Sequence, residues 1–310
     1  MFNIIIFVSL GIGIFILGLV LLTTSLKIIS KEKVKILIDK YTGNIYLSIF
    51  IGFILAIMMQ SSSMTTIIAV SMADAGLLNL YSAAGIIMGA NIGTTVAVQL
   101  YAFDLYNLIP YAIFFGSILR FQKKKLLKFT GNILLGLGII FAGLKVIDMA
   151  VTPLRNFSEI NKYIPITEYP IYGILIGIIL ALIMQSSTFC IAMMQVLATA
   201  KILPVYNAIF ITYGLNIGTC SEAFLMSLAT NREGKKIAIF NIFFNIIGTI
   251  IFLPLTHHYY AILKYMTPNN VSRQIANSHM FFNIISTLLV IPIMKYLFSF
   301  IEMLIGNDTK

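Results

Sequence analysis

One polar motif occurs twice inside strongly apolar segments of this chain. The sequence QSSS at residues 60–63 returns as QSST at residues 185–188, an offset of 125 residues. The same offset relates residues 89–94 to residues 214–219, which share the pattern Gly-x-Asn-Ile-Gly-Thr. A match that keeps its spacing over this distance indicates a duplication. Both halves should therefore fold alike, and both carry hydroxyl groups into an apolar environment.

The composition indicates a membrane protein. Hydrophobic residues make up 59% and charged residues 10% of the chain, and the mean hydropathy is +0.96, far from the composition of soluble domains. We therefore expect an all-α polytopic membrane protein with seven crossings of the roughly 30 Å hydrocarbon layer. The expected spans are 4–26, 81–100, 105–119, 132–151, 206–229, 237–255 and 279–300. The first is long enough to be a span rather than a cleavable signal.

The net charge of +10 comes mainly from Lys and Arg in short connections, which indicates orientation signals rather than a nucleic-acid partner. Basic clusters follow the first, third and fifth spans, at residues 27–40, 120–128 and 232–236. All three should face the cytoplasm. The connection at 152–168 balances both charge signs, so it should be non-cytoplasmic, with the N-terminus outside and the C-terminus inside.

This topology leaves two apolar segments, 44–80 and 169–204, that must enter and leave on the same side. We interpret them as re-entrant helical hairpins. Each half then has three full crossings, so the second repeat is inverted relative to the first, an arrangement that places a shared site near the midplane. The expected units are repeat 1 at 1–125, repeat 2 at 126–256, and a C-terminal extension at 257–310 with one further transmembrane helix.

The hairpin tips coincide with the two serine motifs. Backbone N–H groups at a helix start and Ser hydroxyls can bind an anion, while carbonyl and hydroxyl oxygens can ligate Na⁺. The candidate substrate-binding residues are Gln60, Ser61, Ser62, Ser63, Gln185, Ser186, Ser187, Thr188, Asn91 and Asn216. The candidate Na⁺ ligands are Ser62, Ser63, Thr65, Thr66, Asn91, Thr94, Thr95, Ser187, Thr188, Asn216, Thr219 and Glu222.

Glycine and polar side chains in the middle of the 81–100 and 206–229 spans predict broken helices there. An Asn at a helix break can equally cap the backbone, so for Asn91 and Asn216 both roles stay open. The four motif segments contain no Lys or Arg. An anion would therefore be held by backbone dipoles, hydroxyls and co-bound cations, because a bare anion at a dry midplane is costly. Symport with Na⁺ is the economical hypothesis.

The duplicated motifs resemble the sodium-dependent phosphate cotransporters of the type II class and their bacterial relatives, over nearly the whole chain. Further matching features are Phe-Phe-Asn at 243–245 before Pro254, and the same triplet at 281–283, after His279 and before Pro292. The resemblance implies Na⁺-coupled symport of inorganic phosphate in a bacterial cytoplasmic membrane, both tips contributing ligands, and an elevator-like alternation. Another small oxyanion, a carboxylate, or phosphate export remain the alternatives.

Repeat 2 departs from repeat 1 in ways that make equivalent sites in the two halves unexpected. Cys190 and Ile191 replace Thr65 and Thr66 just after the tip. Glu222 stands opposite Ala97, and an acid inside a membrane suggests a cation or proton role, with a structural pairing as the alternative. Some bacterial relatives continue into a PhoU-like cytosolic domain, which these 310 residues are not expected to include.

Other features indicate structure rather than chemistry. His279 is expected at the start of a span, in a structural or gating role. The repeated Phe-Phe-Asn triplet predicts either two scaffold helices packed together or a homodimer surface. Paired glycines should let helices approach closely; they are Gly11, Gly13, Gly18, Gly136, Gly138 and Gly143. No His or Asp near the tip serines could activate them, so we expect no enzyme and no cofactor beyond Na⁺ as coupling ion. Expected partners are phosphate, Na⁺ and membrane lipid.

Overall fold

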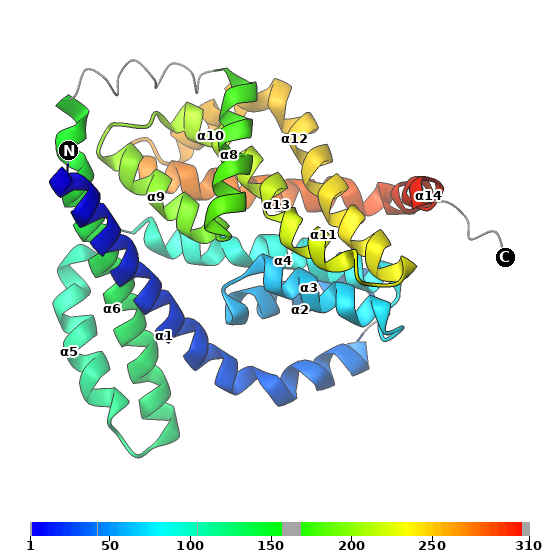
Figure 1. Cartoon of the computed structure of the whole chain (residues 1–310), viewed down its shortest axis with the longest axis horizontal. Helices are drawn as coiled ribbons and strands as arrows, with labels where there is room; N and C mark the ends of the chain where they lie inside the picture. The colour runs from blue at the N-terminus through cyan, green and yellow to red at the C-terminus, as the bar shows by residue number, and fades with distance from the viewer. Residues whose placement is uncertain (1, 42, 104, 157–168, 306–310) are drawn as a thin grey trace.

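The computed structural model describes residues 2–41, 43–103, 105–156 and 169–305, with the side chains of 27–41 left out. All regular elements in these ranges are helices (Figure 1). Six of their segments are long and apolar enough to span a membrane, which makes this a multi-pass membrane protein. They are Phe2–Leu26 of α1 (Phe2–Tyr41), α4 (Leu80–Tyr101), Lys125–Arg155 with α6 (Lys125–Val151), Val205–Ser227 with α10 (Val205–Gly218) and α11 (Cys220–Ser227), α12 (Arg232–Met266), and Val271–Ile305 with α13 (Val271–Val290) and α14 (Met294–Ile305).

The seventh expected crossing, at 105–119, is not among these six segments. This stretch folds as a short 3₁₀ turn, Tyr106–Leu108, and then α5 (Ile109–Arg120) with Pro110 in its first turn. Its 12 residues rise about 18 Å, well short of roughly 30 Å of hydrocarbon. α5 instead packs along α6, so closely that a Cβ on Gly116 would lie 2.5 Å from the Leu135 nitrogen.

Two pairs of short helices occupy the segments where hairpins were expected. In the first half they are α2 (Ile45–Met59) and α3 (Ser62–Asp74), and in the second α8 (Pro170–Met184) and α9 (Ser187–Thr199). The pairs have the same lengths, 15 and 13 residues, and the chain reverses between the two members of each pair. The repeats therefore share a local fold, while their inverted placement in a membrane stays a prediction.

Glycine packs each first hairpin helix onto the long helix that follows. A Cβ on Gly89 of α4 would lie 1.8 Å from the Ile49 oxygen of α2, and one on Gly214 of α10 would lie 2.0 Å from the Ile174 oxygen of α8. Only hydrogen fits at such distances. The glycines of the second motif thus bring two backbones together.

The predicted break in span 81–100 is wrong, because α4 is continuous from Leu80 to Tyr101. Its mid-span hydroxyls need no break, since Thr94 Oγ1 bonds to the Asn91 oxygen at 3.1 Å and Thr95 Oγ1 to the Ile92 oxygen at 2.7 Å. In the second repeat the helix is interrupted at one residue, Thr219. Its φ of −66° and ψ of −14° remain helical, so α11 continues from α10 without unwinding.

The glycines of α1 and α6 confirm the expected close packing. Cβ atoms on Gly11 and Gly143 would meet the facing backbone at 2.9 Å and 2.6 Å, and one on Gly18 would meet the Ile140 nitrogen at 2.6 Å. Gly13 is the exception, with nothing within 4 Å. α1 and α6 therefore form one closely packed pair.

The two helices that carry the Phe-Phe-Asn triplets, α12 and α13, pack against each other. The Tyr259 hydroxyl donates to the Ser278 oxygen at 2.6 Å, and the Phe252 and Phe282 rings are 5.2 Å apart. α12 also packs on α3, and α13 on α9. The scaffold interpretation of the repeated triplet is thus confirmed, and each scaffold helix supports one hairpin.

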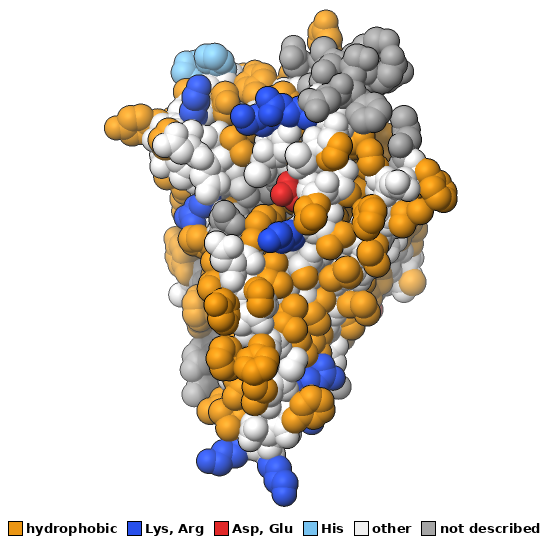
Figure 2. All heavy atoms as spheres, turned by 90° about the vertical axis from the view of Figure 1, so that its left-hand side faces the viewer, with side chains coloured by type: hydrophobic (Ala, Val, Ile, Leu, Met, Phe, Trp, Pro, Cys, Tyr) orange, Lys and Arg blue, Asp and Glu red, His pale blue; other side chains and the backbone are white. Residues whose placement is uncertain are grey.

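The outer surface is apolar over much of its area. Figure 2 shows one face covered largely by hydrophobic side chains, with Lys and Arg projecting from its lower end, where Figure 1 places the turn between α5 and α6. Arg120 and the lysines of 123–128 are exposed at this turn. The side chains of the 27–40 cluster and residues 157–168 of the connection lie outside the described residues. The proposed orientation therefore stays a prediction.

We predict that Gly89→Ala destabilises the protein. The added methyl group would collide with the Ile49 carbonyl, which belongs to a helix backbone and cannot turn aside, and overpacking of this kind costs about 1–3 kcal/mol. Gly13→Ala is the matched control, since nothing faces it and Ala is the better helix former by about 1 kcal/mol. Thermal unfolding in detergent should give a lower melting temperature for the first variant alone; equal melting temperatures would contradict the packing role.

Candidate functional site

All eight tip residues line one cavity of about 350 Å³, which we call the tip cavity. Four come from the first tip, at residues 60–63, and four from the second, at 185–188. Met59, Met64 and four residues of α1 complete the lining; the α1 residues are Leu19, Val20, Thr23 and Thr24. The structure thus brings together two motifs that lie 125 residues apart in the sequence.

Each tip reverses the chain at its glutamine. Gln60 and Gln185 adopt left-handed backbone angles, with φ of 52° and 50°. Residues other than glycine rarely adopt this conformation. The next residue caps the second helix: the Ser61 hydroxyl accepts from the Met64 nitrogen at 3.1 Å, and the Ser186 hydroxyl from the Phe189 nitrogen at 3.3 Å. α3 and α9 therefore both begin at the tip cavity.

These two helix starts offer hydrogen-bond donors to the cavity. The first N–H groups of a helix have no partner within it, and they carry its positive dipole end. Beside them, the hydroxyls of Ser62, Ser187 and Thr188 make no hydrogen bond among the described residues. Ser62 and Ser187 are the first residues of α3 and α9. The cavity is therefore lined with unpaired donors, and none of its described lining residues is Lys or Arg.

The first tip also contacts the second repeat. Ser63 Oγ lies 3.5 Å from the Thr219 oxygen at the junction of α10 and α11. Glu222, one turn further along, is half-buried and lies near the Ser63 side chain. A carbonyl, a hydroxyl and a carboxylate thus meet where α11 packs on α3, and oxygen donors of these kinds suit Na⁺.

Asn91 and Asn216 do not line the tip cavity. Asn91 Nδ2 lies 3.5 Å from Asn241 Oδ1 on α12, and Asn216 Oδ1 lies 3.1 Å from His279 Nε2 on α13. Each motif asparagine therefore joins its own repeat to a scaffold helix. Their role as substrate ligands stays a prediction, and the geometry favours the alternative of a structural contact.

The remaining candidates are divided between helix interiors and the tip neighbourhood. Thr65 Oγ1 bonds to the Ser61 oxygen at 3.0 Å, and Thr219 Oγ1 to the Asn216 oxygen at 3.0 Å. Thr66 is buried in α3. Together with Thr94 and Thr95, most of the threonine hydroxyls are thus already bonded to their own helix.

His279 does not begin a span, contrary to the expectation. α13 starts eight residues earlier, at Val271, after the cap residue Asn270, so His279 is buried in the helix interior. Its partner Asn216 and the residues Asn241, Asn245 and Asn283 form a buried polar layer that the sequence interpretation missed. The echo between residues 241–245 and 279–283 was the available signal. Thr23 and Thr24 also line the tip cavity. Nothing in the sequence marked them as site residues, because they stand at the end of an apolar run.

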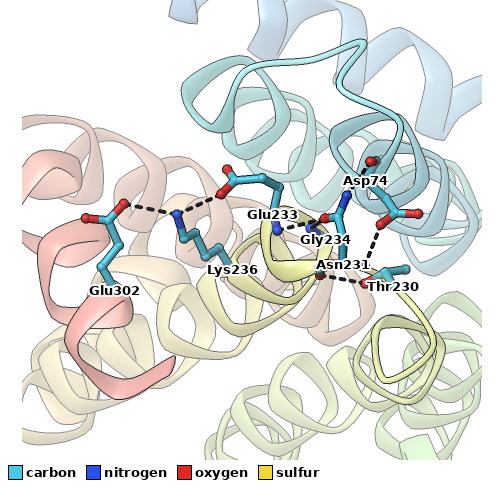
Figure 3. Close-up of polar contacts among 7 residues, drawn as sticks. All are labelled: Asp74, Thr230, Asn231, Glu233, Gly234, Lys236 and Glu302. Carbon is cyan, nitrogen blue, oxygen red and sulfur yellow. Dashed lines mark hydrogen bonds and ion pairs between the residues drawn. The ribbon is translucent and has the colours of Figure 1, made fainter. Parts of the chain in front are cut away.

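The far end of the first hairpin is fixed to the scaffold. The Asn231 nitrogen donates to Asp74 Oδ1 at 2.6 Å, and its side chain donates to the Asp74 oxygen (Figure 3). On the same stretch of α12, Lys236 Nζ pairs with Glu233 at 2.7 Å and with Glu302 of α14 at 3.1 Å. Lys236 is therefore a buried link between helices instead of a solvent-facing orientation signal.

We predict that Asn216 and His279 are energetically coupled. Removing either side chain leaves the other buried without this partner, which costs about 1–3 kcal/mol. In a double-mutant cycle of Asn216→Ala and His279→Ala, the melting data should give a coupling energy of roughly 1 kcal/mol. Ser299→Ala, at an exposed site, is the control. Strictly additive losses would contradict a direct contact.

Comparisons with known proteins agree with the duplicated motifs. A family model described as Na⁺/Pi-cotransporter matches residues 14–149 and 158–267. The Escherichia coli K12 protein named "Putative inorganic phosphate export protein YjbB" is 30% identical over 202 residues, 64% of this chain and 37% of that protein. This chain thus corresponds to well under half the length of that relative.

Two further relatives differ in coverage. The Bacillus subtilis "Uncharacterized protein YqeW" is 25% identical over 244 residues, 77% of this chain and 78% of that protein. The rat "Sodium-dependent phosphate transport protein 2A" is 52% identical over 46 residues, 15% of this chain and 7% of that protein. No solved structure matches. Because the family model covers most of the chain, and the duplicated motifs converge on one cavity, the chain belongs to the Na⁺/Pi-cotransporter family.

Proposed function

We propose that the protein is a secondary active transporter that couples Na⁺ to the movement of inorganic phosphate, with phosphate bound between the two tips. The observation that carries the proposal is the tip cavity, to which both repeats contribute equivalent residues. A site shared by two repeats near the centre of a membrane protein is the arrangement expected of a secondary transporter.

The size and the donors of the cavity suit a small hydrated anion. At about 30 Å³ for each water molecule, its 350 Å³ corresponds to roughly ten waters, enough for phosphate with coupling ions. Two helix N-termini and three free hydroxyls can donate to phosphate oxygens. Binding by neutral donors leaves the charge of phosphate largely uncompensated.

Sodium would supply that compensation. No described residue that lines the tip cavity carries a positive charge, and an anion in such surroundings is strongly disfavoured without an opposite charge. Na⁺ ligands are proposed at the oxygen cluster of Ser63, Thr219 and Glu222, next to the first tip. Coupling then follows from electrostatics, because phosphate and Na⁺ each lower the cost of binding the other.

The membrane arrangement is proposed as inferred from the sequence. The repeats are inverted, hairpins α2–α3 and α8–α9 are re-entrant, and the transporter works by an elevator-like alternation in a bacterial cytoplasmic membrane, as a monomer or homodimer. The support is the shared hairpin geometry and the basic α5–α6 turn. A membrane enzyme is disfavoured, since Glu222, near Ser63, is the one acid or His among the described residues that lies beside the serines of the cavity.

Export is the second candidate function, because one relative is named as a phosphate export protein. Coupled transport is reversible, so the same site serves either direction according to the gradients. Another small oxyanion or a carboxylate would meet the same donors, and the uptake measurement below separates them.

We predict that purified protein in liposomes takes up labelled phosphate under an inward Na⁺ gradient and not under an equal K⁺ gradient. Ser62→Ala and Ser187→Ala should each reduce uptake about tenfold or more, since each removes a donor to a charged ligand worth roughly 1.5–3 kcal/mol. Thr130→Ala, on an exposed part of α6 away from the cavity, should match the parent protein.

Each contrary result identifies the part that fails. Uptake that does not depend on Na⁺ would rule out Na⁺ coupling. Na⁺-driven movement of another anion in place of phosphate would rule out phosphate as the substrate. Full activity in both serine variants would rule out the two tips as the phosphate-binding site. Reversing the Na⁺ gradient over phosphate-loaded liposomes measures export on the same preparation.

We predict that Glu222→Gln raises the Na⁺ concentration needed for half-maximal uptake several-fold. The amide keeps the shape but removes the negative charge beside Ser63, and charge-assisted contacts are roughly twice as strong as neutral ones. Glu222→Ala, which copies Ala97 of the first repeat, should act in the same direction. An unchanged Na⁺ dependence in both variants would exclude Glu222 from the Na⁺ site.

A further inference from the structure

A second cavity lies at the end of α9 that is remote from its tip. It has a volume of about 270 Å³, and we call it the end pocket. The C-terminal ends of α4 and α9 and the start of α13 form its walls. Its lining includes Tyr101, Phe103, Tyr106, Thr199, Asn270 and Ser272.

The end pocket continues inward through a smaller cavity of about 20 Å³. Both cavities share Tyr101, Thr199 and Ser272, and the inner one reaches Ala192. At this depth the Tyr101 hydroxyl and Gln195 Oε1 are buried without a hydrogen-bond partner. Buried polar atoms facing a space of this size normally hold a water molecule. The inner end of the pocket is therefore polar although the helices around it are apolar.

A layer of aromatic rings separates this inner end from the tip cavity. The Phe15 ring lies 5.2 Å from Phe189 and 5.8 Å from Tyr101, and all three are buried. Phe189 directly follows Thr188, which lines the tip cavity, while Tyr101 lines the end pocket. Thr188 and Ala192 are four residues apart on α9, or about 6 Å along the helix. One layer of rings thus closes a short gap between the two cavities.

The corresponding parts of the first repeat are arranged differently. Met64, the counterpart of Phe189, is 41% exposed and lines the tip cavity, whereas Phe189 is 5% exposed. Asp74, the counterpart of Thr199, is bonded to Asn231 at the start of α12 (Figure 3). Thr199 instead faces Asn270, the cap of α13, across the end pocket. Unequal states of two equivalent repeats are what alternating access requires.

We infer that the end pocket is a second vestibule of the translocation path, and that Phe15, Phe189 and Tyr101 form the closed gate between it and the tip cavity. The inference rests on the proposed transport function. Parting of these rings would join the two cavities along α9, and the partnerless Tyr101 and Gln195 atoms would then line the path of a hydrated anion.

The charges at the pocket fit this role. The Arg273 guanidinium lies 4.5 Å from the centre of the Phe103 ring, and Lys145 Nζ lies 5.8 Å from the centre of the Tyr106 ring. Both rings line the end pocket. Cations near the mouth of a cleft raise the local concentration of anions, with Asp148, one turn from Lys145, as the described acid on the same helix.

The gate can be tested without phosphate, by the side from which a membrane-impermeant thiol reagent reaches two engineered cysteines. In a background with Cys190→Ala and Cys220→Ala, Thr199→Cys reports on the end pocket and Met64→Cys on the tip cavity. Reaction in intact cells is compared with reaction in opened cells. We expect the two positions to react from opposite sides of the membrane.

Phe15→Ala, or separately Phe189→Ala, should make Met64→Cys react also from the Thr199 side, at least roughly tenfold faster, as expected when a minor open state becomes populated. Phe114→Ala, at an exposed position on α5 outside the gate, is the control and should leave the rate unchanged. Reaction of both cysteines from one side in the parent protein, or an unchanged rate in the folded gate variants, would overturn the inference. The Phe15→Ala and Phe189→Ala variants test the gate separately, so one can replace the other if it fails to fold. The comparison of the membrane sides from which the two cysteines react needs neither variant.

A flux measurement separates the path from the substrate. A bulky reversible adduct on Thr199→Cys should stop phosphate uptake, and a reducing agent should restore it. The same adduct on Tyr265→Cys, an exposed position on α12, should have no effect. Uptake that continues unchanged when Thr199→Cys carries the adduct would contradict the assignment of the end pocket to the translocation path. If the parent protein moves no phosphate, the thiol measurement alone decides the path, and phosphate is ruled out as the substrate.

Discussion

The structure depends on how two chain reversals are accommodated in an apolar protein. Each reversal, at Gln60 and Gln185, starts a new helix whose first N–H groups have no partner within it. One donor per tip is satisfied by the serine cap, at Ser61 and Ser186. The others need water or a ligand, because bare donors in hydrocarbon are costly. Placing both tips on one cavity meets this need once for the two repeats, and it gathers backbone and hydroxyl donors around one space.

Such a site works only if the tips are held firmly, and glycine makes this possible. α2 lies on α4 and α8 on α10 at distances where carbonyl oxygens touch Cα atoms. The contact leaves no room for sliding without a clash, so each tip moves with the long helix behind it. Asn91 and Asn216 extend the same coupling to α12 and α13. A movement of either scaffold helix would therefore be passed to a tip through these contacts.

The sequence predicted the tips and the family because duplication marks both motifs and their spacing. The predictions from sequence were wrong where one residue type can serve two structural purposes. Glycine in the second motif suggested a broken helix, yet the same glycine is needed for backbone contact with α2, and nothing local distinguishes the two. His279 was placed at a helix start because the preceding residues are polar, although Asn270 caps the helix and tertiary packing buries those residues. The α1 wall of the cavity depends on tertiary packing alone.

The two repeats have diverged where they meet the scaffold and the ions. Asn91 contacts an asparagine, whereas Asn216 contacts a histidine. Among the described residues, only the second repeat has an acid close to a tip, Glu222. Because this carboxylate lies near Ser63 of the first tip, polar groups of both repeats meet beside the tip cavity. An ionised Glu222 beside a bound phosphate would add negative charge to a cavity whose described lining residues carry no positive charge. Charge balance then demands more cation than a symmetric site would need, so the asymmetry itself favours coupling to Na⁺.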